Sequence, residues 1–452
     1  QEHPIYTEYS KSWIDWYNWF TGDNMPLYIR QHPRERDDVF KARKNRAYYF
    51  NYVKPIINLI GSFLFSRAIT RSFHTQGEDL DVVEDSEETE FWDNIDLRGT
   101  NINDFMRQIF TFTKIFGYID VVTDMPQSPF DLATEQQRLE AGLRPYCYYI
   151  LPSQMINWET DDFGDFLWVR WKEKINKLYD PFTMRSGEDV CRYTTWTRDA
   201  WYIDEVVTER GRKPYVRRID AQEHGLGVVP VVRFYGEKDL VIENFGRSLA
   251  ETLGSINVEV LNLCTLVSEE VYSKIFNLLV ARDPLDGVPD AESGDATNTR
   301  GLEIGQNNIL YFVGDIPPFY LAPATDPGEF IVSWISDCID QIYRIANLGN
   351  DTGVDQTKSG VAYGYEFNNT NRMLADNADR MQDGEERVHA IFMRWLGRVW
   401  EGYVDYPDTF DVGSYQEEIA SIVEAKNAVR SETFGRELEK KLIRKMLARA
   451  SA

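Results

Sequence analysis

The residues best suited to catalysis or metal binding are few and scattered in this sequence. The histidines are His3, His32, His74, His224 and His389. The cysteines are Cys147, Cys191, Cys264 and Cys338, and no two of them form a C-x-x-C pair. The motifs G-x-x-x-x-G-K-[ST], G-x-G-x-x-G, H-E-x-x-H and G-x-S-x-G are all missing. We therefore predict no catalytic residues, no cofactor and no metal site, and the separate cysteines fit a reducing cytosol.

Acidic side chains dominate the charge of the chain. There are 73 Asp and Glu against 49 Lys and Arg, a net charge of −24, so tight DNA binding by the whole surface is disfavoured. The pair most suited to a metal, Asp351 and Asp355, is better interpreted as part of a solvated turn. The clearly basic patch near the C-terminus contains Arg436, Lys440, Lys441, Arg444 and Lys445. This patch is either a nucleic-acid contact or simply the charged side of a helix.

The composition is that of an ordered globular protein. Residues are 43% hydrophobic and 14% aromatic, which is enough to build a substantial core in one elongated chain or two to three modules. The most apolar stretch, residues 50 to 65, is interrupted by Lys54 and Pro55, so we expect a buried helix and no membrane association. The N-terminal residues lack the pattern of a secretion signal.

The first half of the chain has a mixed pattern that predicts an α+β fold. Trp13, Trp16 and Phe20 have helical spacing, and residues 34 to 65 have the pattern of one helical run. Residues 78 to 90 are acidic and predict a loop. An amphipathic helix is expected over residues 101 to 116, followed by a strand from Tyr118 to Thr123. Several short strands separated by turns are expected between Tyr146 and Phe234.

After Gly246 the pattern becomes mostly helical. Between residues 247 and 280 one apolar stripe comprises Leu249, Leu253, Ile256, Val260, Leu263, Val267 and Val271. A polar stripe comprises Glu251, Ser255, Glu259, Asn262, Thr265, Glu269 and Ser273. We expect one buried side and one side that faces water or a channel. At about 1.5 Å per residue, some thirty residues make a rod of roughly 45 Å.

Two further helices follow, separated by turn-rich segments. Residues 281 to 327 contain turn residues and short strands such as Ile309 to Val313. The second helix is expected over residues 328 to 347, with a coiled-coil-like seam of Ile331, Ile335, Cys338, Ile342 and Ile345. After a Gly-rich loop, the third repeats apolar residues every seven positions at Phe367, Leu374, Met381, Val388 and Trp395. Gly384 inside it indicates a bend or a close contact.

Several short segments resemble the portal proteins of tailed double-stranded DNA bacteriophages. They comprise Leu27 to Arg30, Arg43 to Asn51, Gly61 to Phe65, Phe116 to Asp124, Gly225 to Val232 and Lys358 to Ala362. The order of these segments, with a rod, an excursion, a second rod, a loop and a long helix, is similar to the order of portal parts. The resemblance implies a ring, usually of about twelve copies, at one capsid vertex. It also implies that the chain is not an enzyme.

The resemblance implies a portal-like fold, which assigns a part to each stretch of the chain. Residues 1 to 246 and 362 to 410 would form an α/β wing, 247 to 280 and 328 to 348 the long-helix stem, 281 to 327 the clip, 349 to 361 the tunnel loop, and 411 to 452 the helical crown. Implied partners are double-stranded DNA bound without sequence preference, the large terminase, adaptor and tail proteins, and the major capsid protein or a scaffold. The expected location is the virion, after synthesis in the bacterial cytoplasm.

The resemblance also gives positions for contacts with DNA. The tunnel loop contains Asp351, Thr357, Lys358 and Ser359. Glu251, Glu259 and Glu269 are candidates for the stem lumen, and the basic C-terminal patch for a crown contact. Duplex DNA carries about one charge per ~1.7 Å of axis, so an acidic wall would permit sliding.

Two other classes of protein fit the same acidic, motif-poor composition. A metal-dependent phosphodiesterase or nuclease would need clustered carboxylates and a divalent metal. A monomeric scaffold or DNA-mimicking binding protein would pack the same helices within a single-chain bundle. Native mass separates both from a ring.

Overall fold

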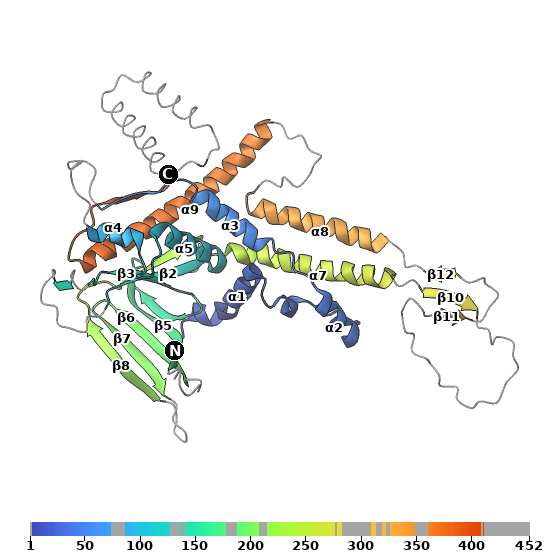
Figure 1. Ribbon diagram of the computed structural model, residues 1–452, viewed down its shortest axis with the longest axis horizontal. Helices are drawn as coiled ribbons and strands as arrows, with labels where there is room; N and C mark the ends of the chain where they lie inside the picture. The colour runs from blue at the N-terminus through green and yellow to red at the C-terminus, as the bar shows by residue number, and fades with distance from the viewer. Residues whose placement is uncertain are drawn as a thin grey trace. The chain divides into compact units, whose positions relative to one another are not determined.

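The computed structural model describes residues 2–73, 86–126, 137–138, 142–177, 188–207, 215–275, 278–282, 309–312, 319–321, 326–348, 360–407 and 410. The chain divides into two compact units. Unit 1 comprises Gln1–Tyr17, Pro55–Glu251 and Val354–Ala452, and unit 2 comprises Asn18–Lys54 and Thr252–Gly353. Helices and sheets are both present, which agrees with the predicted α+β content (Figure 1). Among the described helices, none is long and apolar enough to cross a membrane.

Unit 1 is built on antiparallel sheets. The five-stranded sheet has the order β4-β5-β6-β7-β8, the three-stranded sheet β3-β2-β9, and the short pair β1-β13. The strands are β1 (Thr70–Ser72), β2 (Tyr118–Asp124), β3 (Tyr146–Ile150), β4 (Met155–Thr160), β5 (Phe166–Lys177), β6 (Glu188–Thr197), β7 (Ala200–Val207), β8 (Tyr215–Glu223), β9 (Val231–Tyr235) and β13 (Tyr403–Asp405). The central strand β2 is buried along almost its whole length, which places the core at the three-stranded sheet.

Helices α5 and α9 pack against this small sheet (Figure 1). The helices with all or part of their length in unit 1 are α1 (Pro4–Thr21), α3 (Val53–Leu64), α4 (Ser86–Asp93), α5 (Ile102–Phe116) and α9 (Gly360–Trp395). Asn101 caps α5 by accepting a hydrogen bond from the Asp104 N–H. The predicted apolar face of α5 is buried at Ile102, Phe105 and Ile109.

Three glycines allow the backbone to pack closely where α5 turns into β2. Gly117 ends α5 at a φ of 86°, and a Cβ there would overlap the backbone of Gly246. A Cβ at Gly236 would lie 2.5 Å from the Thr113 carbonyl oxygen. The Gly236 N–H instead donates to the Gly117 carbonyl at 2.7 Å. Larger residues at these positions would separate α5 from the end of β9 and from the start of the long helix that follows.

A buried ion pair joins the strands β2 and β9. Arg233 donates to both carboxylate oxygens of Asp120, at 2.7 and 2.8 Å, and also to the Asn244 carbonyl. The aromatic rings of Tyr118 and Trp158 lie within 4.6 Å of its guanidinium carbon. Because every polar group of the pair is satisfied, the charges are tolerated in the core.

The heptad pattern of α9 is confirmed at three of its positions, whereas Trp395 is half-buried and the side chain of Phe367 lies outside the described residues. Leu374, Met381 and Val388 are buried. Gly384 on this helix packs closely against Phe234 of β9, since a Cβ at Gly384 would overlap the Phe234 ring. From the sequence, Gly384 indicated either a bend in the helix or a close contact, and the structure shows the contact.

Unit 2 contains the other predicted helices and a small strand module. Its helical elements are η1 (Met25–Tyr28), α2 (Asp37–Arg46), most of α7 (Leu249–Ile275) and α8 (Asp326–Ile345). Strand β10 (Leu278–Arg282) pairs in parallel with β11 (Ile309–Phe312) and antiparallel with β12 (Phe319–Leu321). Residues 18–54, from the N-terminal part of the chain, also belong to unit 2.

Two local predictions need correction. The single helical run predicted over residues 34 to 65 is two helices, α2 and α3, separated by extended backbone from Ala47 to Tyr52. The break is stabilised by Asn51, whose side-chain oxygen accepts from the Lys54 N–H at the start of α3. The acidic loop predicted over residues 78 to 90 is helical from Ser86 onward, and residues 78–85 lie outside the described ones.

Gly384→Ala should destabilise unit 1 although alanine is the better helix former. The usual gain of about 1 kcal/mol in a helix interior is outweighed by an overpacking cost of about 1–3 kcal/mol against Phe234. Urea denaturation of this variant, and of Gly384→Ala combined with Phe234→Leu, measures the effect. Exposed Ala390 on the same helix gives the control, since Ala390→Gly reports helix propensity alone. A stabilised Gly384→Ala variant would contradict the packing argument.

Candidate functional site

Helix α7 begins at a capped end and continues for 27 residues, about 40 Å. The Ser248 hydroxyl oxygen accepts from the Glu251 N–H at 3.0 Å. Of the predicted apolar stripe, Leu253 and Val260 are buried, whereas Val271 is 53% exposed. The apolar stripe is therefore covered by the chain itself only in the first part of the helix.

Two asparagines on α7 hold extended backbone of the N-terminal segment. The Asn257 side-chain oxygen accepts from the Tyr52 N–H at 2.9 Å, and its amide donates to the Phe50 carbonyl at 2.8 Å. The Asn262 oxygen accepts from the Arg30 N–H at 2.8 Å, and its amide donates to the Tyr28 carbonyl at 3.1 Å. A side-chain amide has the same donor and acceptor as a peptide group, so each asparagine replaces the pairing that a neighbouring strand would supply.

Arg43 of α2 is the centre of a second polar contact with α7. Its guanidinium donates to both oxygens of the Glu35 carboxylate at 2.8 and 2.7 Å, to the Thr265 hydroxyl at 2.7 Å, and to the Arg30 carbonyl at 2.9 Å. These hydrogen bonds from Arg43 hold the pKa of Glu35 below its usual range. Thr265 and Arg43 are buried.

The polar stripe of α7 is therefore not one open surface. Asn262 and Thr265 were expected to face water or a channel, but the N-terminal segment buries both. Glu259 forms an ion pair with Arg30 at 3.5 Å, and Glu269 forms one with Arg46. The sequence missed this contact because the basic residues lie more than 200 positions before their partners. Residues 30–46, the α2 region, carry mostly positive charges, and the polar stripe of α7 carries negative ones. This charge complementarity is the sequence signal that could have indicated the contact.

Glu251, the third predicted lumen residue, lies at the unit 1 end of α7. It is partly buried, and this burial raises its pKa, with an opposing effect from Arg247. The three glutamates thus have three different environments along one helix. Their proposed position in a lumen stays a prediction.

Apolar packing also holds the N-terminal segment, residues 18–54, against α7 in unit 2. Met25, Ile29 and Leu261 form a buried cluster, covered by Trp19, Tyr28, Phe40, Ala47 and Tyr49. A Cβ at Gly254 would overlap the Trp19 ring, so α7 has a glycine where this indole lies against it. Residues 18–54 therefore form a continuous cover on one side of α7.

Helices α7 and α8 form an antiparallel pair within unit 2. A Cβ at Gly328, at the start of α8, would lie 2.9 Å from the carboxylate of Glu270 near the end of α7. Cys338 and Ile342 of the predicted seam are buried, and Ile331 and Ile335 are half-buried. Ile345 was expected in the seam but is exposed, and the neighbouring Ala346 is buried instead. Figure 1 shows α8 beside α7, with β10–β12 at one end of the pair.

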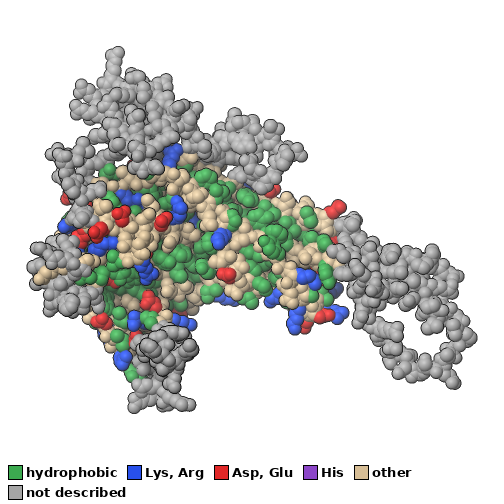
Figure 2. All heavy atoms as spheres, viewed as in Figure 1, with side chains coloured by type: hydrophobic (Ala, Val, Ile, Leu, Met, Phe, Trp, Pro, Cys, Tyr) green, Lys and Arg blue, Asp and Glu red, His purple; other side chains and the backbone are tan. Residues whose placement is uncertain are grey.

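Both helices of this pair expose large apolar side chains. On α8 these are Phe330, Val332 and Trp334, which are 72%, 54% and 49% exposed, and on α7 they are Leu266, Val271 and Tyr272. Figure 2 shows hydrophobic side chains gathered over the two helices. Exposed apolar side chains clustered in this way are typical of a surface that binds another protein.

The α2 region is basic in an otherwise acidic chain. Residues 30–46 contain seven Lys or Arg and three Asp or Glu. Arg34, Arg36 and Lys41 are exposed, and Lys and Arg side chains gather around α2 in Figure 2. The sequence analysis had singled out only the C-terminal basic patch.

Several predicted site residues lie outside the described part of the chain. They are Asp351, Asp355, Thr357, Lys358 and Ser359 of the Gly-rich loop, and Arg436, Lys440, Lys441, Arg444 and Lys445 near the C-terminus. Most of the predicted clip and the predicted crown also lie outside it. Within the described residues, no three His, Cys, Asp or Glu side chains are grouped closely enough to hold a metal ion.

Comparison with known proteins gives no family assignment. No family model and no curated protein match the sequence. Among solved structures, a chain in the "neck of empty GTA particle computed with C6 symmetry" is similar with a TM-score of 0.42 and 10% identity, covering 91% of this chain and 95% of that chain. A chain in the "virion of native gene transfer agent (GTA) particle" has a TM-score of 0.38 and 8% identity, covering 93% and 99%. Likeness at this level carries no functional argument.

Asn262→Leu should loosen the N-terminal segment from α7. The Arg30 N–H would lose its partner, at a cost of about 1–3 kcal/mol for a buried unsatisfied group. Hydrogen exchange measured by mass spectrometry should show faster exchange over residues 28–52, with unchanged protection in β2 and β9 of unit 1. Ser255→Leu, at an exposed position of the same helix, is the matched control. Equal protection in the two variants would show that the asparagine does not hold the segment.

Proposed function

We propose that this chain is the portal subunit of a tailed bacteriophage or a related particle, a ring at one capsid vertex through which DNA passes. The observation that carries the proposal is the antiparallel pair α7–α8, which has a strand module at one end and exposed apolar side chains on both helices. A monomeric helical bundle would bury these side chains within the chain. A ring buries them between neighbouring copies.

Two different apolar surfaces fit cyclic assembly. A ring needs a heterologous interface, in which one surface of each copy meets a different surface of the next. The side chains of α8, Phe330 and Trp334, and those of α7, Leu266 and Val271, supply two such surfaces. Full burial of one such side chain contributes about 1.5–3 kcal/mol, so four per interface would support stable association.

The charge of the chain favours a conduit over a DNA-binding protein. A net charge of −24 per copy repels phosphate overall, so DNA would not be held tightly by the wall and could slide. Glu259 and Glu269 are each paired with an arginine, so a lumen formed by this face would present compensated charges. Non-specific contact by the loop around Lys358 completes the proposal, since Lys358 places one positive charge per copy on an otherwise acidic wall.

The proposed partners follow from the same role. They are further copies of this chain, double-stranded DNA, the large terminase, adaptor and tail proteins, and the major capsid protein or a scaffold. The proposed location is the virion, with no enzymatic activity in this chain.

Trp334→Asp combined with Phe330→Asp should prevent ring assembly. A charge on an apolar interface must be desolvated without a partner, which is strongly unfavourable. Native mass spectrometry and negative-stain imaging at moderate salt should show a ring of about a dozen wild-type copies and only small species for the variant. Val399→Asp, at a position 80% exposed in unit 1, is the control and should still assemble. A stable wild-type monomer or dimer would contradict the proposal and favour the nuclease or scaffold alternatives, which a nuclease assay with Mg²⁺ or Mn²⁺ would separate.

Lys358→Ala should reduce DNA packaging while ring assembly stays normal. Loss of this charge removes one phosphate contact per copy, and because salt weakens the same contact in the wild type, the difference between the two should shrink at higher salt. Packaged DNA per particle and native mass are the two measurements. Gln356→Ala, in the same loop but not among the candidate DNA contacts, controls for disturbance of the loop. Normal packaging by the lysine variant would contradict the role proposed for Lys358.

A further inference from the structure

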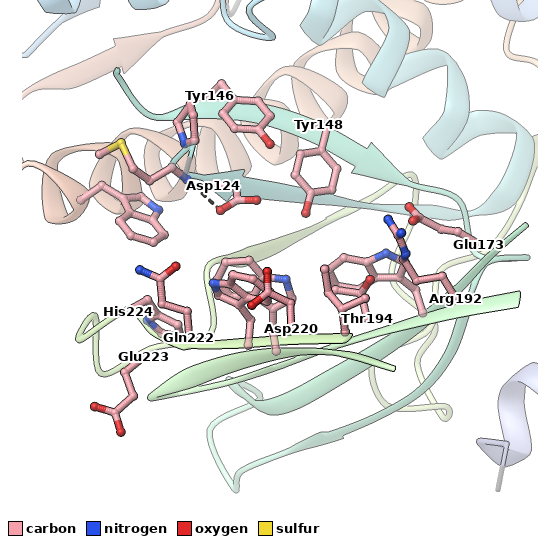
Figure 3. A pocket seen from close by; sticks show the side chains of 17 residues that line it. Asp124, Tyr146, Tyr148, Glu173, Arg192, Thr194, Asp220, Gln222, Glu223 and His224 are labelled. Carbon is pink, nitrogen blue, oxygen red and sulfur yellow. Dashed lines mark hydrogen bonds between the residues drawn. The ribbon is translucent and has the colours of Figure 1, made fainter. Parts of the chain in front are cut away.

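Unit 1 contains a hollow of about 510 Å³ between its two larger sheets. Asp124, Tyr146 and Tyr148, from β2 and β3, lie on one side, and Figure 3 shows them opposite Thr194, Asp220 and Gln222 of the five-stranded sheet. Trp395 at the end of α9 closes part of the rim, where its indole N–H donates to the Thr123 carbonyl at 2.9 Å. The size is in the range of small-ligand sites, about 300–1,000 Å³.

Aromatic side chains form much of the wall of the hollow. They are Tyr146, Tyr148, Trp171, Trp196, Trp201 and Trp395. The face of an aromatic ring carries partial negative charge and attracts cations, most strongly at tryptophan. Trp171 and Trp196 are almost completely buried, whereas Tyr146, Tyr148 and Trp395 are half-buried, so the rings of these three are the ones available for stacking.

The charged groups of the hollow are mainly carboxylates. Asp124, Glu173, Asp220 and Glu223 line it, and among the described lining residues the only Lys or Arg is Arg192, which lies opposite Glu173 across strands β5 and β6. Arg192 donates to Glu205 at 3.1 Å, so its charge is already compensated. Burial lowers the pKa of His224, which also lines the hollow. The hollow therefore has an excess of negative charge.

Asp124 is one of the two half-buried carboxylates of the hollow, whereas Asp220 and Glu223 are exposed. Asp124 accepts a hydrogen bond from the Met125 N–H at 2.8 Å. Burial raises its pKa to about 6, against the effects of the hydrogen bonds from Met125 and Tyr146. A cation bound beside Asp124 would stabilise the ionised carboxylate and lower its pKa. By linkage, the ionised carboxylate would bind the cation more tightly than the protonated one does.

We propose that this hollow binds a guanidinium group, with the aromatic rings stacking on its plane and Asp124 and Asp220 accepting its N–H groups. A guanidinium is planar, stacks on aromatic rings and matches a carboxylate with two parallel hydrogen bonds. The group can come from an arginine side chain of a partner protein or from a free small molecule. The site lies wholly in unit 1 and does not depend on the portal proposal.

Calorimetric titration of the full chain with N-acetyl-arginine amide tests the site. The matched neutral control is N-acetyl-citrulline amide, which keeps the shape and removes the charge. The arginine compound should bind at least about tenfold more tightly, a difference of about 1.4 kcal/mol. Binding should weaken as the pH falls from 7 to 5, because protonation of Asp124 removes the acceptor charge. Equal affinity for the two compounds, or no binding of either to the folded chain, would overturn the proposal.

Asp220→Asn and Asp124→Asn should each weaken binding of the arginine compound about tenfold, the size of one lost charged contact. Asp220 lies on the exposed strand β8, so this variant tests the site even if Asp124→Asn disturbs folding. Asp162→Asn, at an exposed turn outside the hollow, is the control. A peptide with a central arginine that binds more tightly than the amide would identify a protein as the source, and equal binding would identify a free cation. Unchanged affinity for the arginine compound in both Asp220→Asn and Asp124→Asn would contradict the proposed guanidinium site.

Discussion

The arrangement of unit 2 depends on satisfying the backbone of an extended segment against a helix. Residues 28–52 include stretches without helix or strand partners, and buried peptide groups without partners are costly. Asn257 and Asn262, five residues apart on α7, supply one donor and one acceptor to each of two such stretches. The position of α2, the ion pairs to Glu259 and Glu269, and the cluster around Leu261 all depend on these four hydrogen bonds.

This cover changes what the remaining surface of α7 and α8 can do. One side of α7 is used within the chain, and the polar groups there are paired with the α2 region. The exposed apolar side chains therefore remain on the other parts of the α7–α8 pair, and those are the surfaces we assign to neighbouring copies. Stability of a copy and its assembly into a ring would thus use separate groups of residues on the same helices.

Unit 1 combines tight backbone packing with polar groups in its interior. The glycines 117, 236 and 246 allow α5, β2 and β9 to meet, and the Asp120–Arg233 pair joins the two strands. The hollow between the sheets is different, since four of its described lining residues are carboxylates and one is an arginine. An aromatic hollow lined by more carboxylates than cations, with a raised pKa at one of them, is a candidate binding site.

The sequence by itself determined the local elements: α5, α7, α8 and α9 follow from apolar periodicity, and the change of character near Gly246 from composition. These features depend on neighbours a few positions apart. Only the tertiary structure decided that Asn262 and Thr265 are buried, that Gly384 meets Phe234, and that strands and a helix far apart in sequence enclose a hollow. Each joins residues more than 100 positions apart, and periodicity within a segment contains no information about the partner that will cover it.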